Sequence, residues 1–116
     1  YDVALILASV LPVSDYHAAK DSRFRRTTDR PPQDIVSINR WLRAFCEARG
    51  YIYLDYYGAT VDDKGMLRAE LADDGLHPNA EGYKIMAPLA EQAIKKALDA
   101  RKRPEKQTSK KRFGVF

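Results

Sequence analysis

An aspartate and a histidine three positions apart, Asp74 and His77, are the residues of this 116-residue chain whose spacing best suits catalysis. In a turn, this spacing lets the carboxylate reach the imidazole Nδ1–H, which fixes the ring tautomer and leaves Nε2 free as a base. Gly75 permits the tight turn. Pro78 biases His77 toward an extended conformation, and Asn79 can cap a following helix. The pattern predicts two of the three groups of a Ser-His-Asp arrangement, the alternative being a histidine that merely packs or faces solvent.

A few other polar side chains could bind a metal, cleave a glycosidic bond or bind a sugar, but each also has a simpler structural explanation. His17 lies near Asp15 and Asp21 but without the i, i+4 spacing of helical metal ligands, so a solvated loop histidine is favoured over a metal site. Paired carboxylates can cleave glycosidic bonds, yet acidic surface turns explain the acidic residues of 62–74 more simply. Those residues are Asp62, Asp63, Glu70, Asp73 and Asp74. The four tyrosines of 51–57 are assigned to packing rather than to a platform for sugars or bases.

The segment 14–33 shows no clear periodicity and holds two adjacent prolines, which predicts a long loop. Long loops in compact domains often line a site, so this one is a candidate rim for a pocket. Its arginines could steer anionic substrates, although a solvated loop is the simpler expectation. They are Arg23, Arg25, Arg26 and Arg30. Ser14 is a candidate hydroxyl nucleophile near His77, but no sharp strand-to-helix elbow presents it.

The elements that must position these residues follow from hydrophobic patterning. The apolar stretch 2–13 is typical of a strand buried on both faces of a parallel sheet. From Asp34 to Ala48 apolar residues recur at helical spacing, which predicts an amphipathic helix. Its expected inner face consists of Ile35, Ile38, Trp41, Leu42, Phe45 and Ala48. Gly50 then suits the left-handed position that stops a helix.

A second strand and a second helix complete the pattern. The stretch 51–57 carries the aromatic and β-branched residues of a strand, and the mixed stretch 58–76 predicts at most a short helical turn. A final helix is expected from Asn79 to about Arg101, with Pro88 bending it or removing one hydrogen bond. Its expected inner side comprises Tyr83, Met86, Leu89, Ala90, Ala93, Ile94, Ala97 and Leu98. The order β-α-β-α predicts an α/β fold with parallel strands joined by a right-handed crossover.

Composition limits the possible classes of protein. The length suits one domain, and a hydrophobic content of 45% can support a core. The longest apolar run, 3–13, is too short to span a membrane. The single cysteine, Cys46, rules out an intrachain disulfide. The net positive charge lies in 101–116, which we expect to be a disordered basic tail without specific nucleic-acid binding, whereas 1–100 is mildly acidic.

Four segments occur together in an order and spacing typical of one enzyme family. They are LASVLPVSDY, NRWLRAFCEARGYIYLDYY, GMLRAELADDG and DGLHPNAEGY. From about Asp2 to about Leu98, the chain resembles the C-terminal half of the SGNH hydrolases, also called GDSL-type lipases and esterases. The resemblance implies a flavodoxin-like, three-layer α/β/α domain with five parallel strands, of which 1–100 would supply the last two. It also implies ester hydrolysis through a serine acyl-enzyme without metal or organic cofactor, with Asp74 orienting the base His77.

The chain departs from the family pattern because it contains no Gly-Asp-Ser and no Gly-x-Asn-Asp segment, so the nucleophile and the oxyanion donors are absent from it. Two parallel strands also leave unpaired edges, which a complementary N-terminal half or a homo-oligomer would cover. The expected function is hydrolysis of a small ester, to which this chain contributes Asp74 and His77. The alternative is a noncatalytic α/β fragment that serves as a packing or interaction module.

Overall fold

The computed structural model describes residues 3–111, with side chains described for 3–101. It contains two strands and three α-helices with two short 3-10 turns, Ser22–Phe24 and Ala69–Leu71. The strands and α-helices are β1 (Ile6–Ala8), α1 (Pro32–Arg49), β2 (Ile52–Leu54), α2 (Tyr56–Thr60) and α3 (Ala80–Lys111). The predicted α/β class is confirmed.

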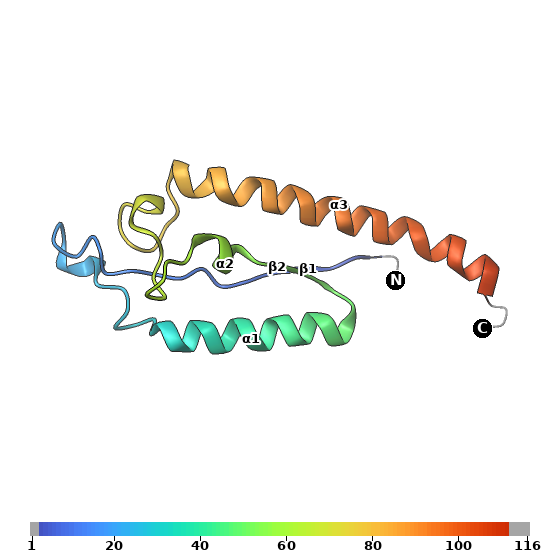
Figure 1. Cartoon of the computed structure of the whole chain (residues 1–116), viewed down its shortest axis with the longest axis horizontal. Helices are drawn as coiled ribbons and strands as arrows, with labels where there is room; N and C mark the ends of the chain where they lie inside the picture. The colour runs from blue at the N-terminus through green and yellow to red at the C-terminus, as the bar shows by residue number, and fades with distance from the viewer. Residues whose placement is uncertain (1–2, 112–116) are drawn as a thin grey trace.

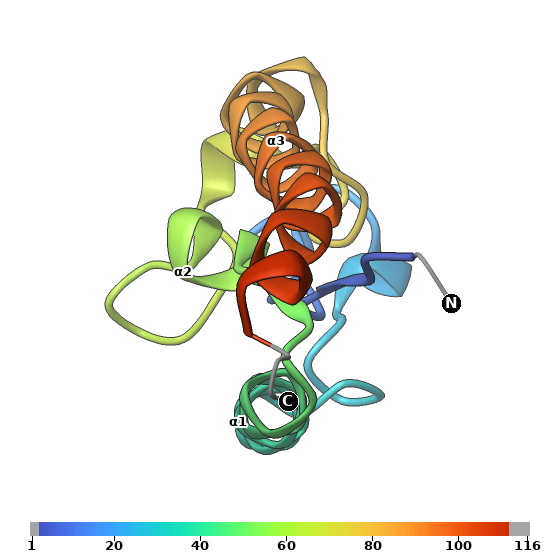
Figure 2. The same ribbon diagram turned by 90° about the vertical axis from the view of Figure 1, so that its right-hand side faces the viewer.

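The strands and long helices form three layers. β1 and β2 pair in parallel, with Ile6 opposite Ile52 and Ala8 opposite Leu54. Helix α1 lies on one face of this pair and α3 on the other (Figures 1 and 2). The arrangement is the predicted partial α/β/α fold, reduced to two strands within the described residues.

Both strands are shorter than the sequence predicts. Only three residues of the stretch 2–13 pair as β1, and β2 ends at Leu54. Asp55 then accepts a hydrogen bond from the Gly58 N–H at 2.9 Å and caps α2. Because this side-chain acceptor turns the chain into a helix, the end of the predicted strand 51–57 is α2 instead.

Helix α1 begins at Pro32, where the missing N–H of proline costs nothing, and it stops as predicted at Gly50, whose φ is 72°. Its buried face differs from the predicted one. The fully buried residues are Ile35, Asn39 and Cys46. Three residues of the predicted inner face are exposed, namely Ile38 at 48%, Trp41 at 62% and Ala48. The helix therefore buries a narrower stripe, which includes a polar residue.

Helix α3 starts as predicted after Asn79, whose Oδ1 accepts the Gly82 N–H at 3.1 Å. It runs without a break through Pro88 to Lys111, past the predicted end near Arg101. Ala93 and Ala97 of its expected inner side are buried. Others are about half exposed, namely Tyr83, Ile94 and Leu98. The disorder expected of 101–116 stays a prediction, and 112–116 fall outside the described residues.

The core of the chain is small and much apolar surface is exposed. Leu67, Leu71 and Ala72 form a buried cluster against which Ile85 packs. Along the first segment, expected to be buried on both faces, Val3 is 67%, Leu5 44% and Val10 41% exposed. The radius of gyration is 18.3 Å, whereas a compact domain of this size has about 13 Å. No helix in the described part of the chain is long and apolar enough to cross a bilayer.

Candidate functional site

The turn that precedes α3 lies at the carboxyl ends of the two strands (Figure 1), where open α/β folds place their sites. A bridge between Ala72 and Pro78 closes the turn. Gly75, at its tip, has a φ of 78°. A Cβ at this position would collide with the backbone carbonyl of Ser14. Both the conformation and the close approach therefore require glycine.

The structure brings Asp74 and His77 together as the sequence predicts. Oδ2 of Asp74 lies 2.6 Å from Nδ1 of His77. Oδ1 accepts the backbone N–H groups of Leu76 and His77, each at 2.8 Å. The His77 side chain is 73% exposed, and among the described residues no hydrogen bond involves its Nε2. The ring is thus held by one nitrogen and presents the other to solvent.

The surroundings of Asp74 favour its ionised form. Burial by itself raises the pKa of this carboxyl, whose side chain is 23% exposed. The hydrogen bonds from the His77 ring and from the N–H groups of His77 and Leu76 outweigh burial and hold the pKa of Asp74 well below its usual range. Asp74 is therefore a carboxylate at neutral pH.

A loop arginine that the sequence analysis left in solvent supports this pair. Arg26 Nε donates to the carbonyl oxygen of Asp74 at 3.1 Å, and its terminal nitrogen lies 3.5 Å from Asp74 Oδ2. The loop is itself anchored, because Asp15 accepts the Thr27 N–H at 2.9 Å and the Thr27 hydroxyl at 2.6 Å. Arg26 and Asp74 are far apart in sequence, so no local pattern indicates their contact.

Ser14 is near the pair but buried beneath it. Its exposed fraction is 1%, and its N–H donates to the Gly75 carbonyl at 2.9 Å. Its hydroxyl oxygen lies 3.4 Å from the Tyr16 N–H, which donates to it. Among the described residues no hydrogen bond joins Ser14 to His77. Ser14 thus supports the turn, and this geometry does not favour it as a nucleophile.

A cavity of about 360 Å³ lies beside His77. Only His77 and Arg30 among its lining residues are polar. The apolar lining consists of Val10, Leu11, Pro12, Val13, Leu76 and Pro78. The predicted loop 14–33 thus contributes Arg30 to the rim of a pocket. The space is suited to an apolar group placed beside the His77 side chain.

A residue that the sequence analysis does not single out, Asn39, holds one wall of this cavity. Its side chain, 6% exposed, donates from Nδ2 to the Val10 carbonyl at 2.9 Å. Its Oδ1 accepts the Val10 N–H at 2.7 Å. Asn39 lies four positions after Ile35 on the buried face of α1. A polar residue at that spacing is the signal that could have identified it.

Several other candidates of the sequence analysis have structural partners. His17 Nε2 lies 3.0 Å from the Ala69 carbonyl, which fits a loop-anchoring role. Asp62 accepts the Tyr16 hydroxyl, and Glu70 pairs with Arg68 at 3.0 Å. Within residues 3–101, no three His, Cys, Asp or Glu side chains come together as a metal site would require.

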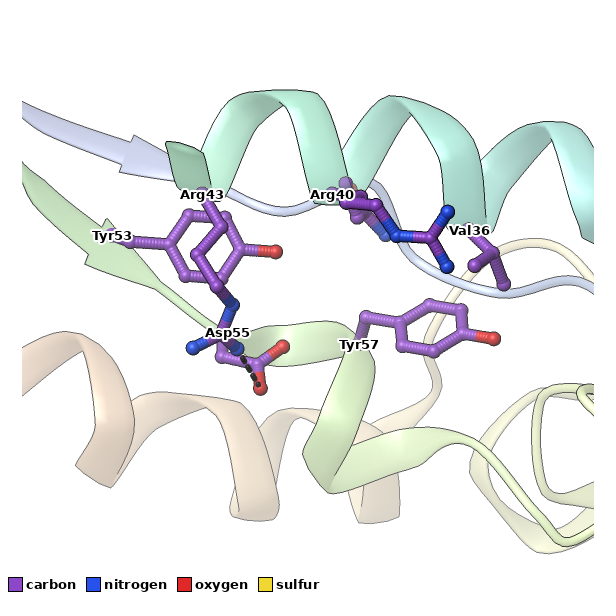
Figure 3. A pocket seen from close by; sticks show the side chains of 7 residues that line it. Val36, Arg40, Arg43, Tyr53, Asp55 and Tyr57 are labelled. Carbon is purple, nitrogen blue, oxygen red and sulfur yellow. Dashed lines mark hydrogen bonds and ion pairs between the residues drawn. The ribbon is translucent and has the colours of Figure 1, made fainter. Parts of the chain in front are cut away.

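A second cavity, of about 310 Å³, lies between α1 and the segment from β2 to α2. Figure 3 shows Arg43 over the ring of Tyr53 and paired with Asp55. The guanidinium lies 4.7 Å from the ring centroid and 3.3 Å from the carboxylate. The exposed face of Tyr53 is therefore covered, as expected of a packing residue. This cavity contains neither His77 nor Asp74.

Comparison with known proteins identifies one family. The GDSL-like lipase/acylhydrolase family model matches residues 8–85. Among solved structures, a GDSL-like lipase of Bacteroides thetaiotaomicron is 36% identical with a TM-score of 0.66, and 81% of this chain is covered. A Bacteroides fragilis protein assigned as an acylhydrolase is 32% identical with a TM-score of 0.67 over 82% of this chain. In each case the match spans 43% of the solved chain. A comparison with curated proteins finds no significant match.

Proposed function

The chain belongs to the GDSL-like lipase/acylhydrolase family of SGNH hydrolases, and on that premise we propose that it provides the base and its orienting acid to an ester hydrolase. The observation that carries the proposal is the 2.6 Å contact between Asp74 and Nδ1 of His77, whose exposed side chain lines a cavity. This geometry fixes the tautomer that a general base needs. A histidine that merely faced solvent would need no such support from its neighbours.

The proposed chemistry proceeds through an acyl-enzyme. Nε2 of His77 takes the proton of a serine hydroxyl as its oxygen attacks the ester carbonyl, and the Asp74 carboxylate stabilises the resulting imidazolium. His77 then gives the proton to the leaving alcohol as the ester C–O bond breaks. A water molecule repeats the sequence, losing a proton to His77 as it attacks the acyl group and releases the serine. The carboxylic acid is the second product.

The attacking serine and the oxyanion donors are proposed to come from a complementary half outside these 116 residues. This chain has no Gly-Asp-Ser segment, and its match spans 43% of the solved relatives. Ser14 is buried at 1% exposure. Without a nucleophile, serine hydrolases lose about 10⁶ in kcat. The isolated chain is therefore expected to hydrolyse esters no faster than buffer.

The test compares hydrolysis of p-nitrophenyl acetate by the chain alone and by the chain joined to a segment carrying the Gly-Asp-Ser nucleophile. We expect turnover only in the joined protein. His77→Ala should reduce it by at least about 10³-fold, in keeping with removal of a catalytic base. Ser14→Ala, the matched control for a nearby serine, should leave the rate of a folded protein within about twofold of the parent.

Three results would contradict the proposal. Turnover by the chain alone that disappears in Ser14→Ala would place the nucleophile inside the chain. Turnover by the joined protein that is unaffected by His77→Ala would show that His77 is not the catalytic base. A well-folded joined protein without turnover would instead favour the noncatalytic packing or interaction module.

A further inference from the structure

The cavity beside His77 is lined by one arginine and by no acidic residue. Arg30 and His77 are its polar residues, and the rest of the lining is apolar. Within the described part of the chain, the Arg30 guanidinium takes part in no hydrogen bond or ion pair. Two other loop arginines form ion pairs, Arg23 with Asp21 at 2.6 Å and Arg26 with Asp74 at 3.5 Å. Arg30 is thus a loop cation available to a ligand in this cavity.

The backbone of Arg30 is fixed by the same contacts that hold the catalytic pair. Its N–H donates to the Arg26 carbonyl at 3.1 Å, and the Arg26 side chain is bonded to Asp74. Thr27, between them, is held by two hydrogen bonds to Asp15. A backbone that is already positioned lowers the entropy that the loop loses when a ligand binds. Arg30 therefore lines the cavity from a well-defined position.

Arg30, the apolar walls and His77 line the same cavity. From this juxtaposition we infer that the site selects anionic esters, in which a short hydrocarbon chain joins the ester group to a terminal carboxylate. The inference rests on the proposed ester hydrolase function, because it names the substrate class of that site. A guanidinium binds a carboxylate through two parallel hydrogen bonds. The cavity, about 360 Å³, is at the small end of the range for ligand sites. Half-esters of short dicarboxylic acids fit both requirements.

The experiment measures binding rather than turnover, so that it does not depend on the nucleophile. Monomethyl adipate, the anionic probe, is titrated into the 116-residue chain and followed through the NMR signals of the His77 ring. Dimethyl adipate, which has the same chain and no charge, serves as the neutral probe. We expect the monomethyl ester to bind at least about 10-fold more tightly than the dimethyl ester, as one charge-assisted contact allows.

Variants assign this preference to a residue. Arg30→Gln should weaken monomethyl adipate binding about 10-fold without changing dimethyl adipate binding, and Arg30→Lys should retain part of the affinity. Arg25→Gln, which removes a loop arginine outside the cavity lining, is the matched control and should bind like the parent. Circular dichroism verifies that each variant is folded.

The inference is overturned if the neutral probe binds as tightly as the anionic one, if neither probe binds, or if Arg25→Gln loses as much affinity as Arg30→Gln. The last result would indicate that the basic loop attracts anionic ligands in general. The two proposals fail separately. Turnover dependent on His77 without an effect of Arg30 on binding contradicts only the anionic substrate. An effect of Arg30 without turnover dependent on His77 contradicts the hydrolase and leaves an anion site.

Discussion

Asp74 makes all three of its side-chain hydrogen bonds to Leu76 and His77, and each one favours the charged carboxylate. Asn at this position keeps an oxygen for the two N–H groups but can donate to Nδ1, which favours the wrong tautomer of His77. In the joined protein, Asp74→Asn is therefore expected to lower kcat by about 10⁴, the loss seen when a Ser-His-Asp triad suffers this change. The measurement is steady-state hydrolysis of p-nitrophenyl acetate. A loss in kcat below about tenfold would show that Asp74 does not orient His77.

The lowered pKa of Asp74 also predicts how stability depends on pH. An unfolded aspartate titrates near pH 3.9, whereas hydrogen bonds keep the pKa of folded Asp74 well below that range. The folded state thus gains stability above about pH 4, and this gain is lost as the pH falls toward the folded pKa. Urea unfolding should show Asp74→Asn less stable than the parent at about pH 6 and the difference shrinking by about pH 3. A difference independent of pH would contradict this origin.

Gly75 gives a third test at the scale of single residues. Its φ is 78°, and a Cβ would meet the Ser14 carbonyl. Gly75→Ala is expected to cost about 1–3 kcal/mol from the strained backbone conformation, with the collision adding to it. Gly65→Ala is a matched control, because its φ is 81° but only Pro32 Cβ approaches, at 4.0 Å. Equal losses in urea unfolding would show that the contact with Ser14 is unimportant.

Among the elements, α1 is tied to the segment after β1 through Asn39. Asn39→Ala leaves the Val10 N–H and carbonyl without their partner. We expect a loss of about 2 kcal/mol in the free energy of unfolding, because each of the two lost hydrogen bonds contributes about 1 kcal/mol. The exposed neighbour Arg40→Ala should change it by less than about 0.5 kcal/mol. The free energy of unfolding is measured by urea unfolding. Similar losses in both variants would show that the contact of Asn39 with Val10 does not stabilise the fold.

The elements also show what local patterns can predict. The helix stop at Gly50, the cap at Asn79 and the contact of Asp74 with His77 each depend on a few neighbouring residues, and each was predicted correctly. The helix faces and strand lengths were predicted less well, because they depend on which surfaces meet in space. The contacts of Asn39 and Arg26 could not be predicted for the same reason, because their partners lie 29 and 48 positions away.

At the scale of the whole molecule, the exposed apolar residues of the first segment and of both long helices predict association. They include Val3, Leu5, Ile38, Trp41, Ile94 and Leu98. Within the described residues β1 has one strand neighbour, so one edge is open to pairing. Sedimentation of the purified chain should therefore depend on concentration at tens of micromolar. A compact monomer over that range would contradict the expectation of a missing partner surface.

Hydrogen bonds to the Ser14 backbone, to Arg26 and within the turn itself hold Asp74, His77 and Gly75. None of them involves the open edge of β1. Damage to that edge and damage to the turn should consequently give separable genetic phenotypes: one class of variants loses assembly while keeping a competent histidine, and the other assembles normally but is inert.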